Sequence, residues 1–187
     1  MTAEELVART GYERIHVIGH SLGGAVALQL ALDSPALVRS LSVINSSAHF
    51  NTSWFVSQLI RLYIRTLGMS GFARLNFRYH LPDPDQEPLR KRLLETMGSN
   101  SADGYLANQD ALEGFNAIPR LGDIGCPVLV VHSDKDLIPI AGKKLITEKV
   151  QRGRFVMIEN SRHLVLWDQP ERLNAVLLEF LAQQTAV

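Results

Sequence analysis

Ser21 stands between two apolar segments, and this junction constrains the fold more than any other part of the chain. An apolar run at residues 15–18 ends at Gly19, and a run of small and apolar residues at 25–31 begins shortly after Gly23. The first run predicts a buried strand and the second a closely packed helix. We expect Ser21, at the apex of the turn between them, to have a strained backbone that projects its hydroxyl above the sheet. We also expect a Cβ at Gly19 or Gly23 to collide with neighbouring backbone.

The motif around Ser21 is G-x-S-x-G, which is short enough to occur by chance because glycine and serine are common. Its position between a strand and a helix of small residues identifies it as a nucleophile elbow, a turn that presents a serine for covalent catalysis. In the structural alternative, Ser21 is only a turn residue. His20 is expected to pack and hydrogen-bond within the elbow and not to act as a base.

Composition limits the classes of protein to which the chain can belong. Its 187 residues are 46% hydrophobic, as expected for one main globular domain. Nineteen basic and nineteen acidic side chains give no net charge, which argues against a nucleic acid partner. Because no apolar stretch of about 18 residues and no signal-peptide pattern is present, we expect a cytoplasmic protein without an integral membrane segment. The single cysteine, Cys126, is expected to be a buried hydrophobe and not a nucleophile.

Short apolar strands alternate with helices along most of the chain. Alternation of this kind predicts an α/β fold with a parallel sheet and flanking helices. Thr2 and Glu5 form the pattern of a capping box for the first helix. The expected strands are residues 14–18, 38–44, 127–132 and 154–158, and the expected helices are residues 2–10, the segment after the elbow to residue 32, 141–151 and 170–183.

Residues 49–117 interrupt this alternation, because they contain three or four segments of helical period and no run that resembles a buried strand. We interpret them as a helical lid inserted between two parts of the core, residues 1–48 and 118–187. Residues 54–79 are rich in aromatic and aliphatic side chains, which suggests an apolar roof over a pocket. Four arginines and no acid lie between residues 51 and 80, which fits a basic face for an anionic substrate or carrier, or an ordinary solvated helix face.

Activation of a serine hydroxyl requires a base, and the base requires a third group that orients it. Asp134 and Asp136 follow one expected strand, and His163 follows the last. Functional groups of parallel sheets collect at the carboxyl ends of strands, so these side chains are expected near Ser21. The order serine, aspartate, histidine is that of hydrolases with a nucleophile elbow. In the alternatives, His163 is a surface residue and the aspartates are turn residues.

These residues resemble the motifs of the α/β-hydrolase family, of the esterase and lipase type, over essentially the whole chain. In that family the acid lies in a segment such as H-G-x-x-D-x-x-x-P and the histidine in one such as G-H-x-x-x-x-x-x-P-E. Here the segment that begins at His132 has Ser133 in place of the glycine and puts Asp136 at the position of the acid, so Asp134 is the less favoured candidate. His163 fits the second motif, including the Pro-Glu pair downstream.

The resemblance also implies an oxyanion site. The N–H of Leu22, the residue after the serine, would donate one hydrogen bond to the negative oxygen of a tetrahedral intermediate. The second donor of the family comes from a loop after its third strand, which has no counterpart in this sequence. We therefore expect a fragment or truncated form of a longer hydrolase, with turnover reduced by about a hundred- to a thousandfold. The strand at residues 14–18 would then be an exposed apolar sheet edge.

We expect a serine hydrolase that cleaves a carboxylic ester or a related acyl bond, with Ser21 as nucleophile, His163 as base and Asp136 as the orienting acid. The expected substrate is a small molecule with an apolar part, and no cofactor is implied. Two alternatives stay open: a lactonase, carbon-carbon bond hydrolase or haloperoxidase-like member of the same fold, and a non-catalytic binding or interaction protein. A metal site is not expected, because the remaining histidines lack ligand spacing. They are His16, His49, His80 and His132.

Overall fold

The computed structural model describes residues 5, 9, 11–50 and 53–185. The chain divides into two compact units, one formed by Met1–His49 with Phe115–Val187 and the other by Phe50–Gly114. Most of the helix expected at residues 2–10, including Thr2 of its capping box, lies outside the described residues.

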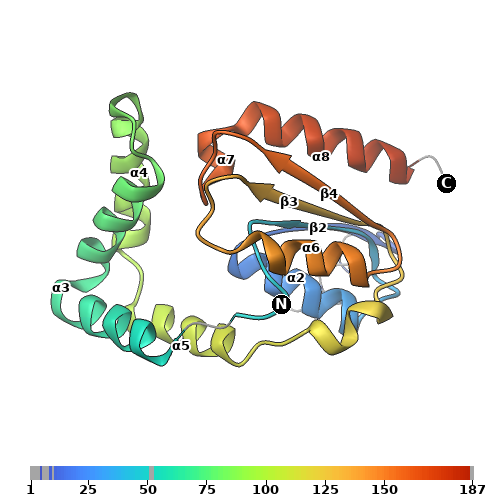
Figure 1. Ribbon diagram of the computed structural model, residues 1–187, viewed down its shortest axis with the longest axis horizontal. Helices are drawn as coiled ribbons and strands as arrows, with labels where there is room; N and C mark the ends of the chain where they lie inside the picture. The colour runs from blue at the N-terminus through green and yellow to red at the C-terminus, as the bar shows by residue number, and fades with distance from the viewer. Residues whose placement is uncertain (1–4, 6–8, 10, 51–52, 186–187) are drawn as a thin grey trace. The chain divides into compact units, whose positions relative to one another are not determined.

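A four-stranded sheet of order β1-β2-β3-β4 forms the centre of the first unit (Figure 1). Each neighbouring pair of strands is parallel. The parallel sheet that the sequence predicts is therefore confirmed, and every strand begins and ends within two residues of its expected bounds. The strands are β1 (Ile15–His20), β2 (Val38–Ile44), β3 (Val128–Ser133) and β4 (Gly153–Ile158).

Helical segments connect these strands, as parallel strands require a crossover connection. The helices that cover the sheet lie on both of its faces, with α2 and α6 on one side and α8 on the other (Figure 1). The segments between strands of this unit are α2 (Leu22–Asp33), the 3-10 helix η2 (Ile118–Asp123) and α6 (Ile140–Lys149), and the last strand is followed by α7 (Val165–Asp168) and α8 (Pro170–Thr185).

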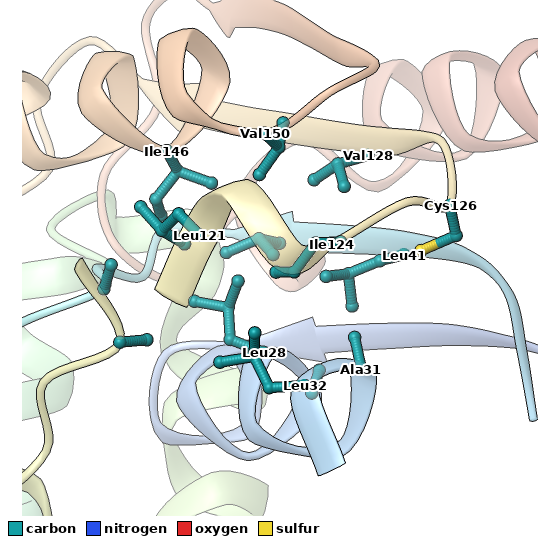
Figure 2. Close-up of a cluster of buried hydrophobic side chains, with 14 of the residues drawn as sticks. Leu28, Ala31, Leu32, Leu41, Leu121, Ile124, Cys126, Val128, Ile146 and Val150 are labelled. Carbon is teal, nitrogen blue, oxygen red and sulfur yellow. The ribbon is translucent and has the colours of Figure 1, made fainter. Parts of the chain in front are cut away.

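Successive residues of β3 face opposite sides of the sheet, so its apolar run contributes to two hydrophobic clusters. Val128 and Val130 pack with side chains of α2, η2 and α6, as Figure 2 shows for Val128. Leu129 and Val131 pack on the other face with side chains of α7 and α8. Burial on both faces explains why the strand is continuously apolar. Cys126 belongs to the first cluster as expected, and burial raises the pKa of its thiol.

β1 lies at one edge of the described sheet and pairs with β2. Val17 packs against the cluster on the α2 side, whereas Ile18 is 48% exposed. The described strands thus leave the outer side of β1 as an exposed apolar edge, as the sequence predicts. This edge strand ends at the turn that holds Ser21.

The second unit is helical. Its long helix α3 is interrupted at Gly68, whose φ of 68° is a left-handed conformation that glycine adopts without strain. A small cluster of Ile64, Met69 and Leu106 joins α3 to α5, and Arg61 forms an ion pair with Asp110. The role of this unit as a lid stays a prediction. Its segments are α3 (Trp54–His80), η1 (Pro84–Gln86), α4 (Glu87–Gly98) and α5 (Ala102–Glu113).

Candidate active site

The turn between β1 and α2 gives Ser21 a φ of 54° and a ψ of −120°, which confirms the expected backbone strain. Three hydrogen bonds hold the serine in this conformation. Its N–H donates to the carbonyl of Ile44 at 3.0 Å, and its carbonyl accepts from the N–H of Gly24 at 2.9 Å. The hydroxyl of Ser46 donates to the same carbonyl at 2.6 Å. The backbone strain is therefore offset by the neighbouring strand β2 and the loop after it.

The glycines of the elbow have different roles. A Cβ at Gly19 would collide with the backbone carbonyl of Gly23, so close contact between strand and helix requires a glycine there. A Cβ at Gly24 would collide with the side chain of Ser46. The expectation for Gly23 is wrong, because a Cβ there would meet no atom within 4 Å. Gly23 lies in the first turn of α2, where its Cβ position faces open space.

The structure brings the side chains of Ser21, His163 and Asp136 into one hydrogen-bonded chain. Nε2 of His163 lies 2.9 Å from Oγ of Ser21, and Nδ1 lies 2.8 Å from Oδ1 of Asp136. An ionised carboxylate only accepts hydrogen bonds, so Nδ1 carries the proton and Nε2 of the neutral ring accepts from the serine hydroxyl. The catalytic roles of these residues stay a prediction.

Asp136 is completely buried, yet its carboxyl group favours the ionised form. Burial by itself raises the pKa of this carboxyl. Contacts with His163 and Lys143 outweigh burial and hold the pKa below its usual range.

Asp134, the other candidate acid, faces a different part of the loop. Its Oδ1 accepts from the N–H of Ser161 at 3.0 Å, and its own N–H donates to the carbonyl of Ile158. Asp134 therefore ties the loop after β3 to the loop after β4. The structure brings Asp136, and not Asp134, to the histidine.

Asn45, which sequence reasoning missed, also connects the end of β3 to the loop after β4. Its buried side-chain amide donates to Oγ of Ser133 at 2.8 Å and to the carbonyl of His163 at 3.0 Å. Its side-chain oxygen accepts from the N–H of Ser133 at 2.9 Å. The available signal was its place directly after an apolar strand, where α/β sheets carry functional groups.

Lys143 is the second residue that sequence reasoning missed. Its Nζ donates to Oδ2 of Asp136 at 2.7 Å and to the carbonyl of Ile138 at 2.6 Å. Both side chains of the Lys143–Asp136 pair are 0% exposed. The available signal was spacing, because Lys143 precedes the buried Ile146 by one helical turn and so lies on the buried face of α6.

The side chain of His20 forms its hydrogen bond outside the elbow, contrary to expectation. Its Nε2 lies 2.8 Å from the carbonyl of His163, to which it donates, and the two rings are 4.9 Å apart. Burial, followed by the proximity of His163, lowers the pKa of His20 to about 4. At neutral pH, His20 is therefore an uncharged support for the backbone of His163.

Leu22 is the first residue of α2, and the first N–H groups of a helix have no partner within it. The side chain of Ser21 makes no capping hydrogen bond to this helix. The N–H of Leu22 is thus suited to donate to an anionic oxygen formed at Ser21.

Two further findings concern the described residues alone. They contain no group of three or more histidine, cysteine, aspartate or glutamate side chains that could hold a metal ion. No helix among them is both long enough and apolar enough to cross a membrane.

The chain is similar to known proteins in sequence and in fold. Residues 2–176 match the model of the alpha/beta hydrolase family. RutD of Agrobacterium fabrum, named as a candidate carbamate hydrolase, is 29% identical over 191 residues, which cover 97% of this chain and 73% of RutD.

Two solved structures have the same fold. An enol-lactonase of Burkholderia xenovorans has a TM-score of 0.85 at 19% identity, and the match covers 95% of this chain and 69% of that one. An esterase of Thermogutta terrifontis has a TM-score of 0.81 at 21% identity, with 96% and 69% covered. The chain spans about seven tenths of the length of these proteins.

Proposed function

Because the chain belongs to the alpha/beta hydrolase family, we propose that it is a serine hydrolase that cleaves a carboxylic ester or a related acyl bond through an acyl-serine intermediate. The observation that carries the proposal is the hydrogen-bonded chain from Ser21 through His163 to Asp136. The strained backbone of Ser21 supports it, because strain of this kind concentrates at functional sites.

In the first half-reaction, Oγ of Ser21 attacks the carbonyl carbon and gives its proton to Nε2 of His163. The carbonyl oxygen becomes negative and accepts a hydrogen bond from the N–H of Leu22. The carbon-oxygen bond to the alcohol then breaks, and His163 returns the proton to the leaving alkoxide. Asp136 holds the ring of His163 in the tautomer that accepts from the serine.

In the second half-reaction, a water molecule replaces the alcohol. His163 takes one proton from the water as its oxygen attacks the acyl carbon. The bond to Ser21 then breaks, and the proton passes to Oγ. The products are a carboxylic acid and the free serine.

The second unit is proposed as a lid over the substrate, which the sequence predicts for residues 49–117. Large apolar side chains on α3 are exposed, including Trp54 at 75% and Phe55 at 65%. Exposed apolar side chains of this size suit contact with an apolar acyl or alkyl group. We therefore propose a small-molecule substrate with an apolar part.

A lactone is the second candidate substrate, because it is a cyclic ester that the same steps would open. The similarity to an enol-lactonase favours this candidate. Carbon-carbon bond hydrolysis and haloperoxidase-like chemistry use the same three residue types, and a non-catalytic binding protein would retain the fold without turnover.

Labelling with a fluorophosphonate, which reacts with activated serines, tests the proposal. We expect labelling of the wild-type chain and of Ser99→Ala, which alters an exposed serine in the second unit. We expect none in Ser21→Ala, with hydrolysis of p-nitrophenyl esters reduced by about a thousandfold or more. A folded wild-type chain that is not labelled would contradict an enzyme and favour a binding protein.

A further inference from the structure

The buried carboxylate of Asp136 is bonded to three nitrogen atoms: the backbone N–H of Ile138, which donates to Oδ1 at 3.3 Å, and one side-chain nitrogen on each oxygen. Oδ1 faces Nδ1 of His163, and Oδ2 accepts from Nζ of Lys143. The second hydrogen bond of Nζ, to the carbonyl of Ile138, fixes the ammonium in the loop that carries the acid. The rotation of the carboxylate is thereby fixed from the side away from the histidine.

An ammonium group at this position needs an explanation other than stability. Replacing a buried ion pair by apolar side chains is often neutral or stabilising, because both charges lose hydration on burial. Lys144, the next residue, is exposed, whereas Lys143 lies on the buried face of α6 beside Ile146. We therefore expect the effect of the Lys143 charge at the Asp136 carboxylate, which it contacts.

We propose that Lys143 is a positioning residue, which holds the Asp136 carboxylate toward His163 and sets the lower limit of the pH range in which His163 acts as a base. This inference rests on the proposed function, since it assigns a role to Lys143 only if His163 activates Ser21.

The sign of the effect follows from the charges. The negative charge of Asp136 stabilises the protonated form of His163. The positive charge of Lys143, which binds the other oxygen of the same carboxylate, destabilises that form. Without the lysine, the attraction of Asp136 is unopposed and His163 stays protonated to higher pH. A protonated ring cannot accept the proton of Ser21, so activation would be lost at a higher pH.

The other titratable groups that face this pair do not replace the charge of Lys143. Burial lowers the pKa of His20, on the elbow, and of His132, on β3, so both rings are neutral at pH 7. Asp134 lies in the same loop but faces Ser161 and not this pair. Burial raises the pKa of its carboxyl, but backbone hydrogen bonds from Ser161 and its neighbour outweigh burial and lower it, so Asp134 is ionised.

The test measures the rate of fluorophosphonate labelling of Ser21 in the full chain between pH 5 and pH 9. In Lys143→Met, we expect the midpoint of the acid limb to rise by about one pH unit, so that the rate at pH values below both midpoints falls about tenfold. Lys144→Met removes one positive charge from the exposed face of the same helix, and Ile146→Ala removes packing from its buried face. Both controls are expected to keep the wild-type midpoint.

Lys143→Gln keeps a hydrogen-bond donor and removes the charge, so it provides the same measurement if Lys143→Met does not fold. We expect its midpoint to rise as well, with a smaller loss of rate. A midpoint that stays in place or falls in folded Lys143→Met or Lys143→Gln overturns the inference. If the wild-type chain is not labelled at all, the proposed function fails; a labelled chain with an unchanged midpoint refutes the role of Lys143 alone.

Discussion

Backbone strain is concentrated at the end of the sheet where the strands have their carboxyl termini. Among the described residues, those other than glycine with positive φ are Ser21, Asn45 and Asn160. They follow β1, β2 and β4, at the carboxyl ends of the strands. Strained residues persist only where surrounding contacts determine them, and here those contacts also hold the Ser21–His163–Asp136 chain.

The lowered pKa of His20 makes the stability of the fold depend on pH. Its pKa falls from 6.5 to about 4 on folding, so the unfolded chain binds the proton first as pH decreases. The stabilisation is complete above pH 6.5 and is lost as pH falls toward 4. We expect wild type to lose about 3 kcal/mol more unfolding free energy than His20→Asn between pH 7 and pH 4, measured by urea denaturation. Parallel curves for the two proteins would contradict this assignment.

The residues of the candidate site differ in how far sequence could identify them. Ser21, Asp136 and His163 belong to spaced motifs, so each could be named before any contact was known. Asn45 and Lys143 carry no such motif, and their partners depend on how loops far apart in sequence meet. Lys143 is followed by Lys144, and two consecutive lysines are expected to be solvent-exposed unless the buried face of the helix is known.

At the level of elements, the sequence pattern predicted the four strands and the helices α2, α6 and α8 of the first unit. The central strands β2 and β3 gave the clearest pattern, because strands buried on both faces are short and continuously apolar. The interruption of α3 at Gly68 was not predicted. A single glycine within a helical pattern is compatible with a straight helix, so the sequence gives no sign of the φ of 68° at this position.

Two glycines of the elbow provide a matched pair for testing the turn. We expect Gly19→Ala to destabilise the protein by about 3 kcal/mol or more, because its Cβ collides with backbone that cannot move without displacing α2. Gly23→Ala is expected to be neutral or to stabilise by up to about 1 kcal/mol, since its Cβ faces open space in a helix. Chemical denaturation of both variants measures the difference, and equal destabilisation would contradict the described turn.

For the whole molecule, the two units differ in how much of each is buried. The fully buried residues of β2 and β3 lie in the first unit, whereas α4 of the second unit has no buried residue. Local opening is easiest where few apolar contacts are broken.

Hydrogen exchange measures this difference segment by segment. We expect amides of β2 and β3 to exchange only on global unfolding, and amides of α4 to exchange at least about a hundredfold faster. Protection of α4 equal to that of β3 would mean that the two units unfold together.

The Lys143–Asp136 pair also affects how this sequence can change over generations. Losing either partner leaves the other charge buried without its counter-charge in this pair, at a cost of about 3–5 kcal/mol, a large part of the 5–15 kcal/mol that keeps a typical domain folded. A sequence changed at only one of the two positions would therefore fold poorly, whereas a change at both positions together would avoid this intermediate. The two positions are expected to be inherited as a unit, although only one of them carries a recognisable motif.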